Sequence, residues 1–225
     1  MRTLITGASS GIGLAMAEFF VARGHEVVGL DLKRAALSHP AYAHVVADVR
    51  DSATLPNLPP FEIVIANAGL QTPLPDAAGA DIATNLVGAM NTARHYAFQP
   101  CIRSLLFNAS ASALTGDEFP EYAASKAGVV GYMRHCAKRL ARDYRATCNA
   151  LCLGGVLTDS NRPVTQDADL WARILAATPL RRWATPAEAA LWAYFLTVDN
   201  RFCTGQAILV DGGEKDAAST FVWPE

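Results

Sequence analysis

The chain has 225 residues, of which 51% are hydrophobic and 18% are charged, and its formal net charge is -2. This composition excludes a disordered chain and a basic nucleic-acid binder, and the length is sufficient to bury a substantial core. The sequence begins Met1-Arg2-Thr3-Leu4 without a signal-peptide pattern, and its apolar stretches are too short to span a bilayer. We therefore expect a cytoplasmic protein with no membrane partner and no nucleic-acid partner.

The cysteines and histidines form no ligand pattern. The five cysteines include no Cys-x-x-Cys pair, and the five histidines lie far apart in the sequence. We expect neither a disulfide framework nor a metal site, and most of the cysteines should be buried as small hydrophobic residues.

Apolar runs of strand length alternate with stretches of helical period along the chain. This alternation is typical of repeated strand-helix-strand units and of a buried parallel sheet. The first strand should end at Thr6, further strands are expected at 26–30, 43–46, 61–66, 104–109, 147–153 and 207–210, and helices at 11–23, 81–98, 120–144, 169–177 and 186–196. Thr185 is the expected N-cap of the last helix, with Pro186 in its first turn. Because no linker interrupts the pattern, we expect one domain covering residues 1–225.

A glycine-rich loop separates the first expected strand from the first helix. Residues 6–13 read Thr-Gly-Ala-Ser-Ser-Gly-Ile-Gly. Glycines in such a turn let the backbone approach a pyrophosphate at the helix N-terminus. The spacing is G-x-x-x-G-x-G and differs from the common G-x-G-x-x-G, so the physical mechanism carries over although the general pattern does not.

Asp31 is expected at the end of the second strand, where it would meet the adenosine of a bound dinucleotide. A carboxylate at this place can accept hydrogen bonds from a ribose and would repel a 2′-phosphate, which favours NAD over NADP. Lys33 and Arg34 follow closely and could meet a phosphate instead. NADP is therefore kept as the less favoured cofactor.

The segment Tyr122-Ala-Ala-Ser-Lys126 sets a phenol and an ammonium four residues apart, on one face of the expected helix. A neighbouring cation favours the phenolate and would lower the pKa of the tyrosine toward the range needed for acid-base chemistry. The spacing alone is common, and a half-buried tyrosine beside a solvated lysine would give the same pattern. The glycine loop in the same chain favours the interpretation that the pair transfers protons.

Taken together, the glycine loop and the tyrosine-lysine pair resemble the short-chain dehydrogenase/reductase family, in its compact single-domain branch. The resemblance covers nearly the whole chain, because further motifs follow in the family's order: Asp48-Val49, Asn67-Ala68-Gly69, residues 149–158, residues 178–189 and Asp211-Gly212-Gly213. It implies a Rossmann-type, doubly wound α/β fold with a seven-stranded parallel sheet. It also implies an NAD(H)-dependent oxidoreductase that interconverts a secondary alcohol and a ketone.

The resemblance assigns four catalytic residues. Tyr122 would be the general acid/base, Lys126 would lower its pKa and bind the nicotinamide ribose, Ser110 would donate to the carbonyl oxygen, and Asn85 would hold a water linked to Lys126. The same resemblance assigns the cofactor contacts to Gly7, Ser9, Ser10, Gly11, Ile12, Gly13, Asp31, Asp48, Val49, Asn67, Ala68, Gly69, Tyr122, Lys126, Gly154, Val156 and Thr158.

The sequence departs from the family pattern in three places. Leu153 precedes Gly154 where the family usually has proline, which adds a backbone donor and would loosen that loop. The spans 31–48 and 69–85 are short, which implies trimmed helices at the edge of the sheet. Ser110 lies one residue nearer the tyrosine than is usual, so Ser112 is kept as the reserve candidate.

The substrate and the assembly are less constrained by the sequence. Residues 159–184 would cap a small alcohol or carbonyl substrate, and Arg162 and Trp171 in this segment favour no single substrate class. The resemblance implies a homodimer or homotetramer that pairs through the helices at 81–98 and 120–144. Two alternatives are an NAD-retaining epimerase or dehydratase, which usually carries a further substrate domain, and an inactive dinucleotide-sensing regulator, which would have lost the tyrosine or the lysine.

Overall fold

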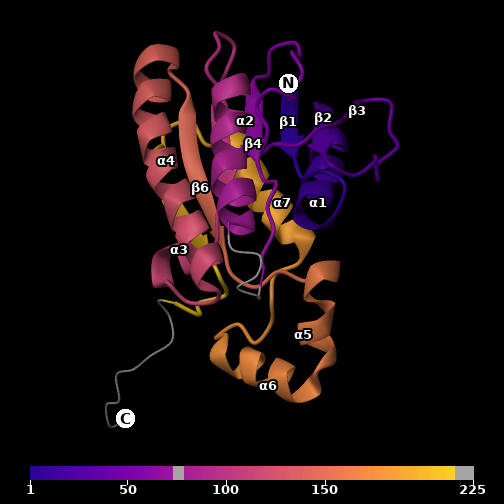
Figure 1. Cartoon of the computed structure of the whole chain (residues 1–225), viewed down its shortest axis with the longest axis vertical. Helices are drawn as coiled ribbons and strands as arrows, with labels where there is room; N and C mark the ends of the chain where they lie inside the picture. The colour runs from indigo at the N-terminus through magenta and orange to yellow at the C-terminus, as the bar shows by residue number, and fades with distance from the viewer. Residues whose placement is uncertain (73–78, 216–225) are drawn as a thin grey trace.

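The computed structural model describes residues 1–72 and 79–215. Its strands form one parallel sheet in the spatial order β3-β2-β1-β4-β5-β6-β7 (Figure 1). The strands are β1 (Arg2–Thr6), β2 (Glu26–Asp31), β3 (Tyr42–Val46), β4 (Ile63–Ala66), β5 (Ser104–Asn108), β6 (Thr147–Leu153) and β7 (Ala207–Val210). The order reverses between β1 and β4, so the chain leaves a crevice at the carboxyl ends of these strands. The predicted fold, a Rossmann-type doubly wound sheet of seven parallel strands in one domain, is confirmed.

Helices cover both faces of the sheet. They are α1 (Gly11–Val21), η2 (Ile82–Val87), α2 (Gly88–Tyr96), α3 (Ser112–Thr115), α4 (Pro120–Tyr144), η3 (Asp159–Asn161), α5 (Arg162–Gln166), α6 (Ala168–Ala177), α7 (Pro186–Tyr194) and η4 (Phe195–Asp199). On one face, Met16 and Phe20 of α1 share a core with Ala189 of α7. On the other face, the core includes Val129 and Met133 of α4. Burial on both faces explains why β4 reads as a continuous apolar run and why every residue of β6 is buried.

Helices α5 and α6 stand apart from this body, beyond the carboxyl edge of the sheet (Figure 1). Their segment rejoins the body at an isolated parallel bridge between Val156 and Ala184. The next helix, α7, begins as predicted: Thr185 Oγ1 accepts from the Glu188 amide, and Glu188 Oε2 accepts from the Thr185 amide, which completes a capping box.

The predicted elements differ from the observed ones mainly at their ends and in short helices. The helix expected at 81–98 starts as the π-helix η2 and ends at Tyr96, and the helix expected at 186–196 ends in the π-helix η4. A π turn of five or six residues within a helix is too short for the hydrophobic period to reveal. Helices α3 and α5 and the 3-10 turn η3 were not predicted, since four or five residues carry too little periodicity.

The edge of the sheet is lightly covered, as the short spans predict. The structure has no helix between β2 and β3. The second short span, 69–85, includes positions 73–78, which lie outside the described residues.

Gly13 in the first turn of α1 tests how closely this helix packs against the glycine loop and the loop after β4. A Cβ added at Gly13 would lie 2.0 Å from the Gly7 carbonyl oxygen and 2.5 Å from Asn67 Nδ2. We expect Gly13→Ala to lower the free energy of unfolding by about 1–3 kcal/mol, as overpacking of a tight site usually does. Urea unfolding measures this change.

The control is Gly131→Ala in the middle of α4, where a Cβ would meet no atom within 4 Å. This variant should be more stable than the parent by about 0.5–1 kcal/mol, because alanine favours a helix interior. Equal effects of the two substitutions would contradict the close approach at Gly13.

Candidate active site

A cleft of about 960 Å³ opens at the carboxyl ends of the strands. It is lined by residues that follow β1 to β6, by the start of α4, and by the segment that contains α5 and α6. The structure places nearly all of the predicted site residues on its wall. The exceptions are Ser9 and Asn85, which lie behind the lining residues.

The predicted phosphate loop is fixed to the loop that follows β4. Thr6 Oγ1 accepts from the backbone amides of Asn67 and Ala68, each at 3.0 Å, and Asn67 Nδ2 donates to the Thr6 carbonyl at 2.9 Å. Gly7 has a φ of +69°, a left-handed conformation that glycine adopts without a steric penalty. Because Gly13 admits no Cβ at this point, α1 starts directly against the loop.

Asp31 lies at the end of the cleft where the adenosine of a dinucleotide is expected. Its carboxylate accepts from the Ser9 amide at 2.9 Å and from the Lys33 amide at 2.9 Å. Asp48 at the same end pairs with Arg50 at 2.6 Å, and this ion pair holds the pKa of the Asp48 carboxyl below its usual value. Asp31, Lys33 and Arg50 all line the cleft, so this end carries both signs of charge.

Lys126 lies at the other end, with only 5% of its surface exposed. Its Nζ donates to the Asn108 carbonyl at 2.9 Å and lies 5.6 Å from the centre of the Tyr122 ring. Burial lowers the pKa of Lys126 to about 8, although the carboxylates of Asp81 and Glu118 act in the opposite direction. The ammonium is therefore held by a backbone dipole and by carboxylates at a distance, without a direct ion pair to either.

Burial also raises the pKa of Tyr122, to about 12, and the nearby Glu118 and Asp81 carboxylates add to this shift. A hydrogen bond with Ser110 acts in the opposite direction. The structure thus differs from the expectation that Lys126 lowers the pKa of this tyrosine. The physical reason is that the buried phenolate would lose its hydration, while the Lys126 ammonium is directed at the Asn108 carbonyl.

The geometry distinguishes the two candidate serines. Ser110 lines the cleft and acts to lower the pKa of Tyr122, and its Oγ accepts from the Ser112 amide at 3.2 Å. Ser112 does not line the cleft, is 2% exposed, and its Oγ has no hydrogen-bond partner among the described residues. The position of Ser110 suits contact with a substrate oxygen.

Asn85 lies in the π-helix η2 and fixes the loop after β4 to helix α4. Its Oδ1 accepts from the Leu70 amide at 2.8 Å, and its Nδ2 donates to the Leu70 carbonyl at 2.9 Å and to Ser125 Oγ at 3.0 Å. Both amide hydrogens are thus used within the protein. In this structure the side chain positions the element that carries Lys126, and it does not itself reach the cleft.

Asn108 is a site residue that the sequence analysis missed. Its carbonyl holds Lys126, and its Nδ2 donates to Asn67 Oδ1 at 2.8 Å. A continuous chain of hydrogen bonds therefore runs from Thr6 through Asn67 and Asn108 to Lys126. Its place at the carboxyl end of β5 is a signal that could have indicated it, since such strand ends form the sites of doubly wound sheets.

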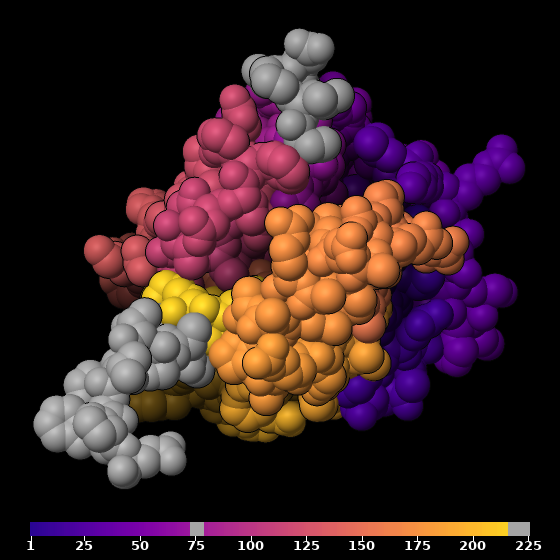
Figure 2. Space-filling model, turned by 90° about the horizontal axis from the view of Figure 1, so that it is seen from below, coloured from indigo at the N-terminus to yellow at the C-terminus, as the bar shows by residue number. Residues whose placement is uncertain are grey.

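The segment with α5 and α6 supplies an apolar wall, formed by Val164, Leu170, Ile174, Ala177 and Trp183. Seen from the side of the strand ends, this segment covers the centre of the molecule (Figure 2). Trp171 does not line the cleft, but packs edge-to-face on Trp183 with ring centres 5.0 Å apart. Arg162 pairs with Asp159 at the surface and is likewise absent from the wall.

Leu153 stands where the family usually has proline. It is the last residue of β6, is 4% exposed, and is paired with Val210 of β7. The Gly154 amide that follows donates to the Val210 carbonyl at 3.0 Å. The loop that was expected to loosen is therefore anchored to the neighbouring strand.

This fold and cleft define a dinucleotide-binding protein, and comparisons with known proteins give its family. A family model described as Enoyl-(Acyl carrier protein) reductase matches residues 7–215. The chain is 32% identical over 230 residues to the 3-oxoacyl-[acyl-carrier-protein] reductase MabA of Mycobacterium tuberculosis, covering 93% of this chain and 91% of MabA. It is 29% identical to galactitol 2-dehydrogenase (L-tagatose-forming) of Cereibacter sphaeroides, covering 93% and 92%. The chain belongs to the short-chain dehydrogenase/reductase family.

Solved structures confirm the fold. 4-Hydroxyisoleucine dehydrogenase complexed with NADH matches with a TM-score of 0.85 at 23% identity, covering 95% of this chain and 98% of that one. A protein from Agrobacterium tumefaciens that is described as a 2-deoxy-d-gluconate 3-dehydrogenase, with bound NADP, matches with a TM-score of 0.84 at 24% identity. The match covers 95% of each chain. The two matched structures contain different nicotinamide cofactors, NADH in one and NADP in the other.

Within residues 1–72 and 79–215, no group of three or more His, Cys, Asp and Glu side chains is placed to hold a metal ion. In the same part of the chain, no helix is long and apolar enough to cross a bilayer.

The two serines can be separated by mutation. We expect Ser110→Ala to lower kcat for ketone reduction by about 10²–10³, because it removes a donor aimed at the oxygen where charge develops. Ser112→Ala should retain activity and stability, since its buried hydroxyl has no partner to lose. Steady-state kinetics on both variants decide the matter, and a larger loss of kcat in Ser112→Ala would reverse the assignment.

The shifted pKa of Lys126 predicts a pH dependence of stability. Between about pH 8 and the usual value of 10.5, the folded chain has released this proton while the unfolded chain still binds it. Stability must then rise with pH, by up to about 1.4 kcal/mol per pH unit for one proton. Other groups titrate in this range, so the measured quantity is the difference in free energy of unfolding between the parent and Lys126→Met. We expect the free energy of unfolding of the parent, minus that of Lys126→Met, to increase from pH 8 to pH 10. If the two free energies of unfolding changed in parallel with pH, the lowered pKa of Lys126 would be contradicted.

Proposed function

We propose that this chain is an NAD(H)-dependent oxidoreductase that interconverts a secondary alcohol and a ketone. The observation that carries this proposal is the meeting of Ser110, Tyr122 and Lys126 at one end of a cleft whose other end is the glycine loop. The nicotinamide cofactor supplies hydride transfer when bound. The chain's own residues then have to orient the substrate and move one proton.

Tyr122 is the proposed proton carrier. In reduction its phenol would donate a proton to the substrate oxygen, and in oxidation its phenolate would accept that proton. Ser110 would donate a hydrogen bond to the same oxygen. The Lys126 ammonium would contact the nicotinamide ribose, and its charge would oppose the upward shift of the Tyr122 pKa without cancelling it. Asn85 would position Lys126 through Ser125 and the loop after β4 and, as the family implies, hold a water linked to it.

The glycine loop and the strand ends are the proposed cofactor contacts. Asp31 supports NAD, because its carboxylate lines the end of the cleft where an adenosine ribose would lie and would repel a 2′-phosphate. Lys33 and Arg50 at the same end moderate this preference. We therefore propose that NAD binds more tightly than NADP.

The substrate would lie between the catalytic end and the segment 159–184. Relatives of similar length are named as a 3-oxoacyl-[acyl-carrier-protein] reductase and as a galactitol 2-dehydrogenase that forms L-tagatose. The apolar wall of α5 and α6 fits the carbon skeleton of a small alcohol or ketone.

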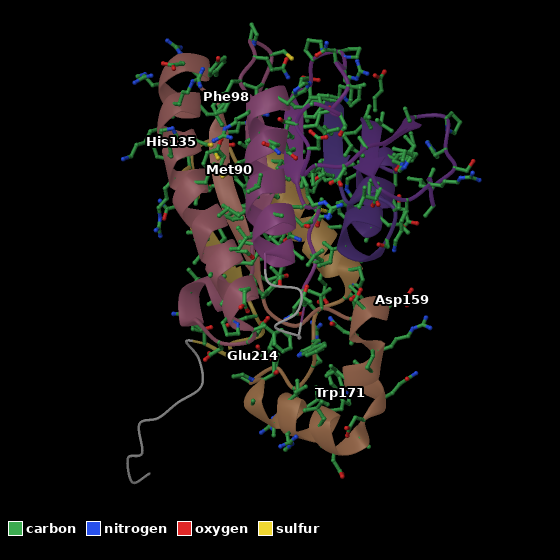
Figure 3. The ribbon with its side chains drawn as sticks, viewed as in Figure 1. Met90, Phe98, His135, Asp159, Trp171 and Glu214 are labelled. Carbon is green, nitrogen blue, oxygen red and sulfur yellow. The ribbon has the colours of Figure 1, made fainter. Side chains whose placement is uncertain are left out.

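We propose a homodimer or homotetramer that pairs through α2 and α4. Met90, Phe98 and His135 lie along the line where these helices run side by side (Figure 3). Phe98, Tyr132 and His135 surround a hollow of about 400 Å³, and the Arg139 guanidinium lies 4.2 Å from the centre of the Phe98 ring. Aromatic and arginine side chains of this kind favour protein contacts. All five cysteines are free, which suits the reducing cytoplasm that we propose as its location.

The test is NADH oxidation against a panel of ketones, with Tyr122→Phe as the variant. We expect turnover to fall by about 10²–10⁴, because the proton carrier is removed with little change in volume. The dissociation constant for NADH should change by less than about twofold, and NADPH should support slower turnover than NADH. Bound NADH without turnover of any ketone would favour the dinucleotide-sensing alternative, and full activity of the variant would refute the role of Tyr122.

A further inference from the structure

The described part of the chain buries one carboxylate and one ammonium, on two elements that pack against each other. Asp81, at the start of η2, is 1% exposed, and Lys126 of α4 is 5% exposed. Every other aspartate, glutamate, lysine and arginine within residues 1–72 and 79–215 has more of its surface in water. Because a buried charge is costly unless it is compensated, the two residues call for a common explanation.

Asp81 does not have the usual task of an aspartate at the start of a helix. Such a residue commonly caps the helix with its side chain, but the Asp81 backbone is itself helical, at φ −62° and ψ −46°, and its carboxylate makes no capping bond. Its Oδ1 is enclosed by protein and has no hydrogen-bond partner among the described residues. Asp81 is also absent from the cleft wall, so it does not touch a bound substrate. Local structure therefore does not account for its burial.

Asp81 lies on the side of η2 that packs against α4. Asp81 and Asn85 are both buried, whereas the three residues between them are only partly buried. Asn85 Nδ2 donates to Ser125 Oγ, in the residue next to Lys126, at 3.0 Å. A Cβ added at Gly69 would lie 2.9 Å from Asn85 Oδ1 and 3.4 Å from Lys126 Nζ, so both groups converge on this glycine. The buried carboxylate thus stands about one helical turn before a residue that adjoins the buried ammonium.

The Asp81 charge acts on both members of the catalytic pair. Burial has the largest effect on each of them, and it lowers the pKa of Lys126 and raises the pKa of Tyr122. Asp81 opposes burial at Lys126 and adds to it at Tyr122, while Ser110 acts to lower the pKa of Tyr122. A carboxylate in this place therefore favours a proton on the amine and a proton on the phenol.

Two other acidic groups face the pair from further elements. Cys152 of β6 and Glu118 of the loop before α4 also act to raise the pKa of Lys126. Burial raises the pKa of Cys152 itself to about 11, so its thiol is neutral at the pH where Lys126 titrates. Glu118 is exposed, and water screens its charge. Asp81 is thus the negative charge near the pair that water screens least.

We propose that Asp81 is the buried counter-charge of Lys126, and that it keeps both Lys126 and Tyr122 protonated at neutral pH. The proposal rests on the proton transfer that the proposed function assigns to Tyr122. In ketone reduction the O–H bond of the phenol breaks and a new O–H bond forms on the substrate oxygen, while the hydride from the cofactor reaches the carbonyl carbon. This direction consumes the proton that Asp81 helps to hold, whereas alcohol oxidation needs the phenolate that Asp81 opposes. Asp81 is therefore a positioning residue that suits the site to ketone reduction at neutral pH.

Nuclear magnetic resonance tests the charge pairing without requiring turnover. The chain has four lysines, at positions 33, 126, 138 and 215, so the Cε resonance of Lys126 is identified by its absence in Lys126→Met. We expect Asp81→Asn to lower the pH at which this resonance titrates by about one pH unit, as removal of a nearby opposite charge does. Asp81→Glu keeps the charge and should restore most of this difference.

Asp117→Asn is the matched control. Asp117 carries the same charge on the loop before α4, but it is exposed. Its substitution should leave the titration of Lys126 unchanged. If Asp81→Asn does not fold, Asp81→Ser takes its place, because serine also removes the charge and keeps a polar side chain.

The pH profiles of the two reaction directions test the effect on catalysis. In Asp81→Asn, the rise of kcat for alcohol oxidation and the decline of kcat for ketone reduction should both lie about one pH unit below those of the parent, because one pair of coupled groups controls both. Asp81→Glu should retain the profiles of the parent. A purely structural role of Asp81 would instead lower kcat at every pH and leave the shape of both profiles unchanged.

These measurements separate the proposal from the proposed function. A titration of Lys126 that is the same in the parent and in Asp81→Asn, or that moves equally in Asp117→Asn, would overturn the proposal. Turnover with pH profiles that Asp81→Asn does not move would also overturn it, and the proposed function would stand. A lowered titration of Lys126 in a protein that reduces no ketone would support the charge pairing, and the proposed function would fail alone.

Discussion

The structure depends on the hydrogen bond between the buried ammonium of Lys126 and the carbonyl of Asn108. A charge removed from water requires compensation, and here a backbone dipole at the end of β5 provides part of it. The same asparagine reaches Asn67, which in turn holds the first turn of the glycine loop. The cofactor end and the catalytic end of the cleft are therefore joined through the polar edge of the sheet, and the position of one constrains the other.

This burial decides the acid-base character of the site. It disfavours both charged forms, so the Tyr122 phenol and the Lys126 amine are shifted toward neutrality, with pKa values of about 12 and about 8. The carboxylates of Asp81 and Glu118 favour the ammonium and oppose the phenolate. Any positive charge added beside Glu118 would weaken that opposition and lower the pKa of the tyrosine.

The sequence was sufficient for features that are local and insufficient for those that depend on distant contacts. The glycine loop, the tyrosine-lysine spacing and the capping box at Thr185 all lie within eight residues, so their geometry follows from the chain itself. The bond from Lys126 to Asn108 and the direction of the Tyr122 pKa shift depend on burial by several elements. Glu118 and Glu214 could not be connected from the sequence, because the loop before α4 and the residues after β7 meet only in the fold.

The cleft consequently has two walls of different origin. The wall with the cofactor loop and catalytic residues is built from strand ends, whose register is fixed by the buried sheet. The other wall is carried by α5 and α6, which join the body through the Val156–Ala184 bridge and the bond from Thr178 to Glu214. Changes in this second wall leave the sheet undisturbed, so substrate preference can vary while the chemistry is kept. Relatives about 30% identical to this chain carry names for different substrates.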